Sequence, residues 1–205
     1  MTISQLSLRT LMFIGSFLSL VFAHSALAGF MIGGSLGAGA VAYREEISTA
    51  ISQTSETGSQ GTSMVSLRIG SKGESSRSYA NMDVLVYSDA DIQTLTWSYD
   101  WLHGNGRSRF VSGISLGIAS LTWKEDDPFN SGLNMELDGE SARHFTLGGR
   151  IGSLAELNSF MDLELMLSLQ VTNLKTEIRT IAGTERYSLD VNLISALTVG
   201  INFSL

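Results

Sequence analysis

The stretch that decides the fold is MDLELMLSLQV, residues 161–171. Every second residue in it is apolar, and most of the residues between are polar or acidic. A β-strand points successive side chains to opposite faces, so this period of two predicts a strand with one apolar and one polar face. Leucine, methionine and glutamate favour helices, but a helix would place Asp162 and Glu164 among the leucines. The pattern therefore favours a strand.

The same alternation recurs along the chain and predicts eight strands. One parity of each segment is apolar, and the other is rich in glycine, serine and threonine. The segments are residues 30–43, 65–69, 80–86, 95–101, 110–119, 145–151, 161–171 and 189–205. In the last segment the predicted apolar row is Leu189, Val191, Leu193, Leu197, Val199, Ile201, Phe203 and Leu205, with Asp190, Asn192, Thr198 and Asn202 on the opposite face.

The connections between these segments alternate in length. Residues 44–62, 124–139 and 172–187 predict long polar loops on one side, and 70–77, 103–108 and 153–159 predict short turns on the other. Outer-membrane barrels alternate long external loops with short periplasmic turns in this way. The connection at 88–91 is the exception, because it is external by this order but short. The predicted fold is all-β: an eight-stranded antiparallel up-and-down transmembrane β-barrel over residues 29–205.

The first 28 residues have the features of a cleaved signal peptide. Arg9 precedes an apolar run over residues 11–23, and Ala26 and Ala28 supply the small side chains that a signal peptidase accepts before Gly29. The apolar run is shorter than the roughly 20 residues that a membrane-spanning helix needs. We therefore expect cleavage before Gly29 and a mature protein in the bacterial outer membrane.

Composition excludes several classes of function. The chain has 13 basic and 20 acidic residues, a formal net charge of −7, which argues against nucleic-acid binding. It contains no cysteine, so neither disulfides nor thiolate metal sites stabilise the fold. We expect no cofactor.

The position of the charged residues favours a membrane barrel over a soluble periplasmic β-protein, which would also show alternation. A basic side chain facing lipid costs about 2–4 kcal/mol at the bilayer midplane. The strand-centre charges, Asp190 among them, all share the polar parity, and only Arg143, near a strand end, lies with the apolar one. Six of them are expected to form a polar network in the lumen, with Arg150 opposite Asp162: Arg68, Asp83, Asp100, Arg150, Asp162 and Glu164.

Aromatic residues gather near the predicted strand ends, as they do at membrane interfaces. They are Phe30, Tyr43, Tyr79, Tyr87, Trp101, Phe110, Trp123, Phe160, Tyr187 and Phe203.

The C-terminus resembles the terminal assembly signal of bacterial outer-membrane barrels. The matching residues are Thr198, Gly200, Phe203 and Leu205, although the family's usual last residue is aromatic. With the eight strands and the signal peptide, the chain resembles the small outer-membrane barrels typified by the OmpA transmembrane domain and OmpX. The resemblance implies a monomer in contact with outer-membrane lipids and lipopolysaccharide, inserted by the barrel-insertion machinery.

Barrels of this kind have diverse functions, so the fold alone does not assign one. We expect a structural or surface-interaction role through the long external loops, with an unknown external ligand. The alternative is a narrow ion or small-solute channel, gated when the lumen charges exchange salt-bridge partners.

A lipid A-modifying enzyme is a weaker alternative. Glu140, Ser141 and His144 are close in sequence, but Ser141 and His144 have opposite strand parity, so no catalytic residue is predicted. Acidic residues in the loops could attract divalent cations, but their spacing matches no calcium loop and no metal site is predicted. These residues are Glu45, Glu46, Glu56, Glu125, Asp126, Asp127, Asp138 and Glu140.

Overall fold

The computed structural model describes residues 29–49, 51–86, 90–123, 142–179 and 186–205. The predicted signal peptide, with Ala26 and Ala28, and the predicted loop at 124–139 lie outside these residues. In the described ranges every regular element is a strand, and none is a helix long and apolar enough to cross a membrane.

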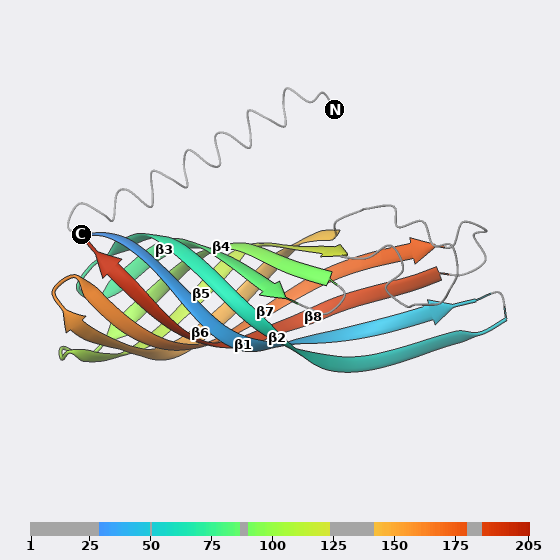
Figure 1. The fold of residues 1–205 in the computed structure, drawn as a ribbon, viewed down its shortest axis with the longest axis horizontal. Helices are drawn as coiled ribbons and strands as arrows, with labels where there is room; N and C mark the ends of the chain where they lie inside the picture. Colours follow the sequence, from blue (N-terminus) through green and yellow to red (C-terminus); the bar gives the residue numbers. More distant parts are fainter. Residues whose placement is uncertain (1–28, 50, 87–89, 124–141, 180–185) are drawn as a thin grey trace, which may run out of the picture.

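Eight antiparallel strands form a closed barrel in chain order, which confirms the predicted fold class (Figure 1). Each strand pairs with its neighbours in sequence, and β1 pairs with β8 to close the ring. Closure removes the free sheet edges at the level where all eight strands are present. The strands are β1 (Gly29–Ser48), β2 (Gln53–Lys72), β3 (Ser76–Val86), β4 (Ala90–His103), β5 (Ser108–Trp123), β6 (Ala142–Asn158), β7 (Met161–Arg179) and β8 (Arg186–Ser204).

The two ends of the barrel differ. Both Gly29 and Leu205 lie at one end, with the short turns at 73–75, 104–107 and 159–160, and we name this the terminal end. Gly104 has a φ of 101°, a conformation that glycine adopts without strain, and it begins the turn between β4 and β5. The opposite end carries the β1–β2 turn and the other connections, and we name it the loop end.

An apolar belt surrounds the outer face. In β7 the apolar row of the opening stretch points outward, and Leu163, Leu165, Leu167 and Leu169 are all exposed. The row continues on neighbouring strands, for instance at Ile151 and Leu197, which pair with Leu167. An apolar surface this extensive is far larger than a water-soluble monomer exposes.

Part of the predicted aromatic belt is present at the terminal end. Its exposed members there are Phe30, Trp101, Phe110, Phe160 and Phe203. Tyr79 is a wrong assignment, because it points into the lumen and is 1% exposed. Tyr43 also points inward, where it packs against buried apolar side chains.

Two predicted loops are largely strand. Residues 44–62 form the ends of β1 and β2, joined by a tight turn in which Thr49 N donates to Ser52 O at 2.8 Å. Likewise β7 runs on to Arg179 and β8 begins at Arg186, within the loop predicted at 172–187. Figure 1 shows the β1–β2 and β7–β8 hairpins reaching beyond β3 and β4 at the loop end.

A β-bulge in β8 overturns part of the predicted outward row. Ala42 of β1 pairs with Leu193, and Tyr43 pairs with Val191, so Asn192 is an extra residue. The extra residue reverses the alternation. Leu189 and Val191 therefore face inward and are buried, whereas Asn192 is exposed and Asp190 leaves the lumen.

Candidate functional site

The centre of the lumen holds a buried ionic cluster around Arg77. Arg77 Nε lies 2.8 Å from Asp100 Oδ2, and Arg77 Nη1 lies 2.7 Å from Glu164 Oε2. Arg68 forms a second ion pair with Glu164, and Arg150 Nε lies 3.6 Å from Asp100 Oδ1. All five side chains are at least nine-tenths buried. Three cations thus share two carboxylates in a space that excludes bulk water, where such charges must pair.

Tyr79 lies at the middle of the three arginines. The guanidinium carbons of Arg68, Arg77 and Arg150 lie 5.3–5.5 Å from its ring centroid, within the range of cation–π attraction. Its hydroxyl donates to Asp100 Oδ2 at 2.8 Å. The ring therefore stabilises a cationic excess that the two carboxylates do not fully offset.

Neutral polar groups complete the cluster. Asn202 Nδ2 donates to Glu164 Oε2 at 3.0 Å, and Arg68 Nη2 donates to Ser35 Oγ at 2.9 Å. A side chain at Gly113 would overlap the Asp100 carboxylate, so only glycine fits beside it. The small residues of the polar parity thus make room for long charged side chains from facing strands.

A second ionic group lies nearer the terminal end. Lys72 Nζ lies 2.6 Å from Asp162 Oδ2 and 3.7 Å from Glu156 Oε1, and Glu156 also pairs with Arg109. Arg109 Nη1 donates to the backbone oxygen of Glu74 at 2.6 Å, in the turn between β2 and β3. These contacts tie the turns of the terminal end together.

The residues of the predicted polar network lie in the lumen, but one predicted pairing between them was wrong. All six predicted residues are buried in the lumen. Arg150, however, pairs in register with Ser168 rather than lying opposite Asp162, because β6 continues to Asn158 and the turn lies at 159–160. Asp83 joins none of the ion pairs among described residues, and instead accepts hydrogen bonds from Asn81 and from Thr94, the latter at 2.8 Å.

Sequence reasoning missed Lys72, Arg77 and Tyr79. The two basic residues fell in a predicted turn at 70–77, and Tyr79 was assigned to the aromatic belt. A signal for two of them was present, because Arg77 and Tyr79 share the parity of Asn81 and Asp83. Extending that alternation from Asn81 by two more alternate positions, to Tyr79 and Arg77, would have placed both in the lumen.

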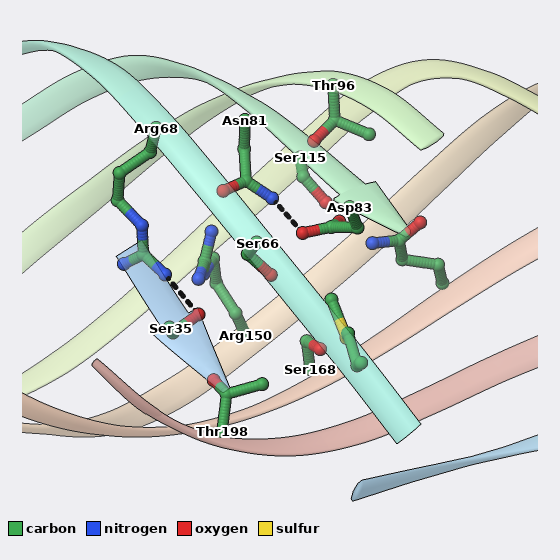
Figure 2. Close-up of a pocket in the computed structure, with 12 residues that line it drawn as sticks. Ser35, Ser66, Arg68, Asn81, Asp83, Thr96, Ser115, Arg150, Ser168 and Thr198 are labelled. Atoms are coloured by element: carbon green, nitrogen blue, oxygen red, sulfur yellow. Dashed lines mark hydrogen bonds between the residues drawn. The ribbon is translucent and has the colours of Figure 1, made fainter. Parts of the chain in front are cut away.

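A small cavity lies between the ionic cluster and the loop end (Figure 2). Its lining includes Ser66, Arg68, Asp83, Arg150 and Gln170. The space measures about 10 Å³, near the lower limit for holding one water molecule. It is polar but too small for a solute.

Apolar side chains fill the lumen at both sides of the ionic cluster. Towards the terminal end Leu102, Val111, Leu154 and Met166 pack together beside the Lys72 group. Towards the loop end a larger apolar layer forms, to which inward-facing residues on both sides of the β8 bulge contribute. The members of this layer are Val41, Met64, Leu85, Ile92, Ala119, Leu121, Leu174, Leu189, Val191, Ile194 and Ala196.

The residues of the predicted terminal signal lie at the end of β8, and Leu205 directly follows that strand. Thr198 and Gly200 face the lumen, whereas Phe203 faces outward. Leu205 is 84% exposed, and its backbone N–H donates to Phe30 O at 2.8 Å. The assembly role of these residues stays a prediction, as does cleavage before Gly29, the first residue of β1.

The candidate catalytic group is incomplete in the described residues. Glu140 and Ser141 lie outside them, and His144 is exposed, with Nδ1 3.2 Å from Phe145 O. A different pair was missed by sequence reasoning: His103 Nε2 lies 2.8 Å from Ser112 Oγ, near the terminal end. Among the described side chains, no carboxylate accepts a hydrogen bond from His103, so the third member of a triad is lacking there.

The acidic loop candidates are divided in the same way. Glu45, Glu46 and Glu56 lie in the β1–β2 hairpin, and Glu125, Asp126, Asp127 and Asp138 lie outside the described residues. Within the described ranges, side chains of histidine, aspartate and glutamate form no group of three that could hold a metal ion.

Known structures share this fold at low sequence identity. The sequence matches no protein-family model and none of the curated proteins. Neisserial surface protein A is similar in structure, with a TM-score of 0.56 and 11% identity over 86% of this chain and 97% of that one. The outer membrane protein OprG from Pseudomonas aeruginosa gives 0.54 and 14% over 87% and 97%.

A third similar structure is the outer membrane protease OmpT from Escherichia coli, with a TM-score of 0.52 and 7% identity over 86% of this chain and 97% of that one. These neighbours include one protease and two proteins whose names state no enzymatic activity. They therefore do not assign an activity to this chain. They do show that the fold is that of the small outer-membrane β-barrels, as the sequence predicted.

Proposed function

We propose that the chain is an integral outer-membrane β-barrel that acts by surface interaction rather than by transport or catalysis. The observation that carries this proposal is a sheet of four strands that continues above the apolar belt. We name it the external sheet; it comprises residues 172–179, 186–196, 39–48 and 53–62 of β7, β8, β1 and β2.

The outer face of this sheet has the polarity of a surface in water. Arg44 pairs in register with Asp190, and Asp190 pairs with Lys175, so charged residues follow one another across three strands. Lower on the same face of β7 lie Leu167 and Leu169 of the belt. A strand that crosses the membrane border changes in this way, because a charge facing lipid is costly and one facing water is not.

The proposal sets the orientation and the partners of the barrel. The terminal end faces the periplasm and the external sheet faces outward, since outer-membrane barrels have short turns on the periplasmic side and longer connections outside. The belt contacts outer-membrane lipids and lipopolysaccharide, the insertion machinery reads the C-terminal strand, and the barrel works as a monomer without a cofactor.

Cell fractionation tests the proposal directly. The protein is expected in the outer-membrane pellet, with gel migration that changes on heating because a folded barrel resists dodecyl sulfate until it is heated. Cysteine introduced at Thr57, in the external sheet, should react with a membrane-impermeant maleimide on whole cells, whereas cysteine at Asn105, in a turn of the terminal end, should not. Recovery in the soluble periplasm would refute the proposal.

A gated channel is the second candidate, favoured by the lumen cavity beside Arg68 and Arg150. The apolar layer towards the loop end weighs against it, because an ion that crosses this layer loses its hydration. We expect no conductance steps in planar bilayers from the wild type, and none from Arg150→Ala, which leaves this layer intact. Sustained steps from Arg150→Ala alone would instead support the channel.

A further inference from the structure

Among the strands that the structure describes, the external sheet has an open edge along β2. Within the described ranges, β3 pairs with β2 from Ser63 to Lys72, so residues 53–62 have one partner strand there, β1. Ten strand residues extend about 33 Å.

This edge lacks three of the features that normally prevent strand addition, and its one charged residue is Glu56. Natural edge strands carry proline, lysine or a bulge, or are very short. Residues 53–62 read QTSETGSQGT, with neither proline nor lysine. Their register with β1 continues without a break from Ser48↔Gln53 to Gly39↔Thr62. The strand is therefore long, free of bulges against β1 and able to accept another strand.

The β1–β2 turn determines which backbone groups face the open side. Because Thr49 N donates to Ser52 O, residue 52 belongs to a hydrogen-bonded pair with β1. Hydrogen-bonded and non-hydrogen-bonded pairs alternate along an antiparallel ladder, so residues 54, 56, 58, 60 and 62 also point their backbone groups to β1. The N–H and C=O groups of Ser55, Thr57 and Ser59 therefore face the open edge.

Two carboxylates lie side by side on the inner face of this hairpin. Glu45 and Glu56 are directly opposite in register, and like charges in such a pair are destabilising. Among the described side chains neither forms an ion pair, whereas on the outer face Arg44 Nε donates to Ser55 Oγ at 3.0 Å and Gln53 donates to Glu46. The inner face thus has an unbalanced negative charge beside the open edge.

We propose that the open edge of β2 binds an extended segment of another protein by strand addition, and that this segment places a lysine or arginine opposite Glu56. This inference rests on the proposed function, since it names the partner of the external sheet. An added strand pairs with the N–H and C=O groups that Ser55, Thr57 and Ser59 point to the open side. Its residue opposite Glu56 falls in a non-hydrogen-bonded pair, where facing side chains are closest, so one cation offsets both carboxylates.

Labelled nine-residue peptides test the proposal on the folded protein in lipid nanodiscs. The probe alternates threonine and valine with lysine at its centre, and its counterpart has glutamate there. Fluorescence anisotropy is expected to show binding of the lysine peptide at least about tenfold tighter than the glutamate peptide, from an attractive rather than a repulsive cross-strand pair. Empty nanodiscs give the background for peptide partitioning into lipid.

Three variants locate the site. Ser59→Pro removes an N–H that faces the open edge and should abolish binding, whereas Ser59→Ala should bind as the wild type does. Glu56→Gln should reduce the preference for the lysine peptide to about threefold or less. Heat-modifiable migration of each variant shows that the barrel is folded.

Equal binding by Ser59→Pro and Ser59→Ala, or no preference between the two peptides, would overturn the proposal. If neither peptide binds although fractionation and surface labelling place the external sheet outside the cell, the strand-addition site is refuted and the proposed function stands. Recovery of the protein in the soluble periplasm would refute the proposed function itself.

Discussion

Replacement of Glu164 by glutamine is expected to destabilise the folded barrel by about 3–5 kcal/mol. Glu164 is 1% exposed and pairs with both Arg68 and Arg77. The amide keeps the shape of the side chain but removes the charge, which leaves three buried guanidinium groups around Tyr79 with Asp100 as their anion. The free energy of unfolding, measured by denaturant titration of the protein in lipid vesicles, provides the test.

Two further variants separate charge pairing from other causes. Glu74→Gln makes the same chemical change in an exposed turn and should alter stability by no more than about 0.5 kcal/mol. The double variant Arg68→Met with Glu164→Gln should regain part of the lost stability, because removing a second charge relieves the excess. A loss below about 1 kcal/mol in Glu164→Gln would show that water reaches the cluster.

The number of strands and the facing of their central residues could be predicted from the sequence. An apolar outer belt and a narrow polar lumen impose opposite demands, so the alternation is strongest at the level of the belt, as at Leu163, Glu164 and Leu165. The six lumen charges were identified for the same reason. The pairing of Arg150 with Asp162 was predicted wrongly, because strand register depends on where each turn lies. The β6–β7 turn lies at 159–160, at the end of the predicted turn region 153–159.

The external sheet could not be predicted in the same way. Above the belt both faces of a strand are compatible with polar residues, so the alternation that marks a strand disappears. Residues 53–62 are serine, threonine, glutamine, glycine and glutamate, a composition typical of loops. Their strand structure depends on pairing with β1, which itself continues past Tyr43, and no local pattern reveals that.

The bulge in β8 was hidden for a related reason. Leu189, Val191 and Leu193 keep an unbroken period of two, which predicts one face for all three. In the structure, the side chains of Leu189 and Val191 point inward and belong to an apolar layer inside the barrel, while Leu193 faces outward. Because lipid and a dry lumen both accept leucine and valine, an apolar pattern alone cannot distinguish them at the loop end.

Leu167→Arg is expected to cost about 2–4 kcal/mol of folding free energy in lipid vesicles. Leu167 lies near the middle of the outward row of β7, with Ile151 and Leu197 as its apolar neighbours in register, so an arginine there has no polar group within the belt to pair with. The matched control is Asn173→Arg, an exposed position on the same strand above the belt, which should change stability by no more than about 0.5 kcal/mol. Only a lipid environment separates the two variants, since in water an arginine at either exposed position is tolerated. If both variants changed the folding free energy by the same small amount, the belt would not lie in the membrane, whatever the barrel fold.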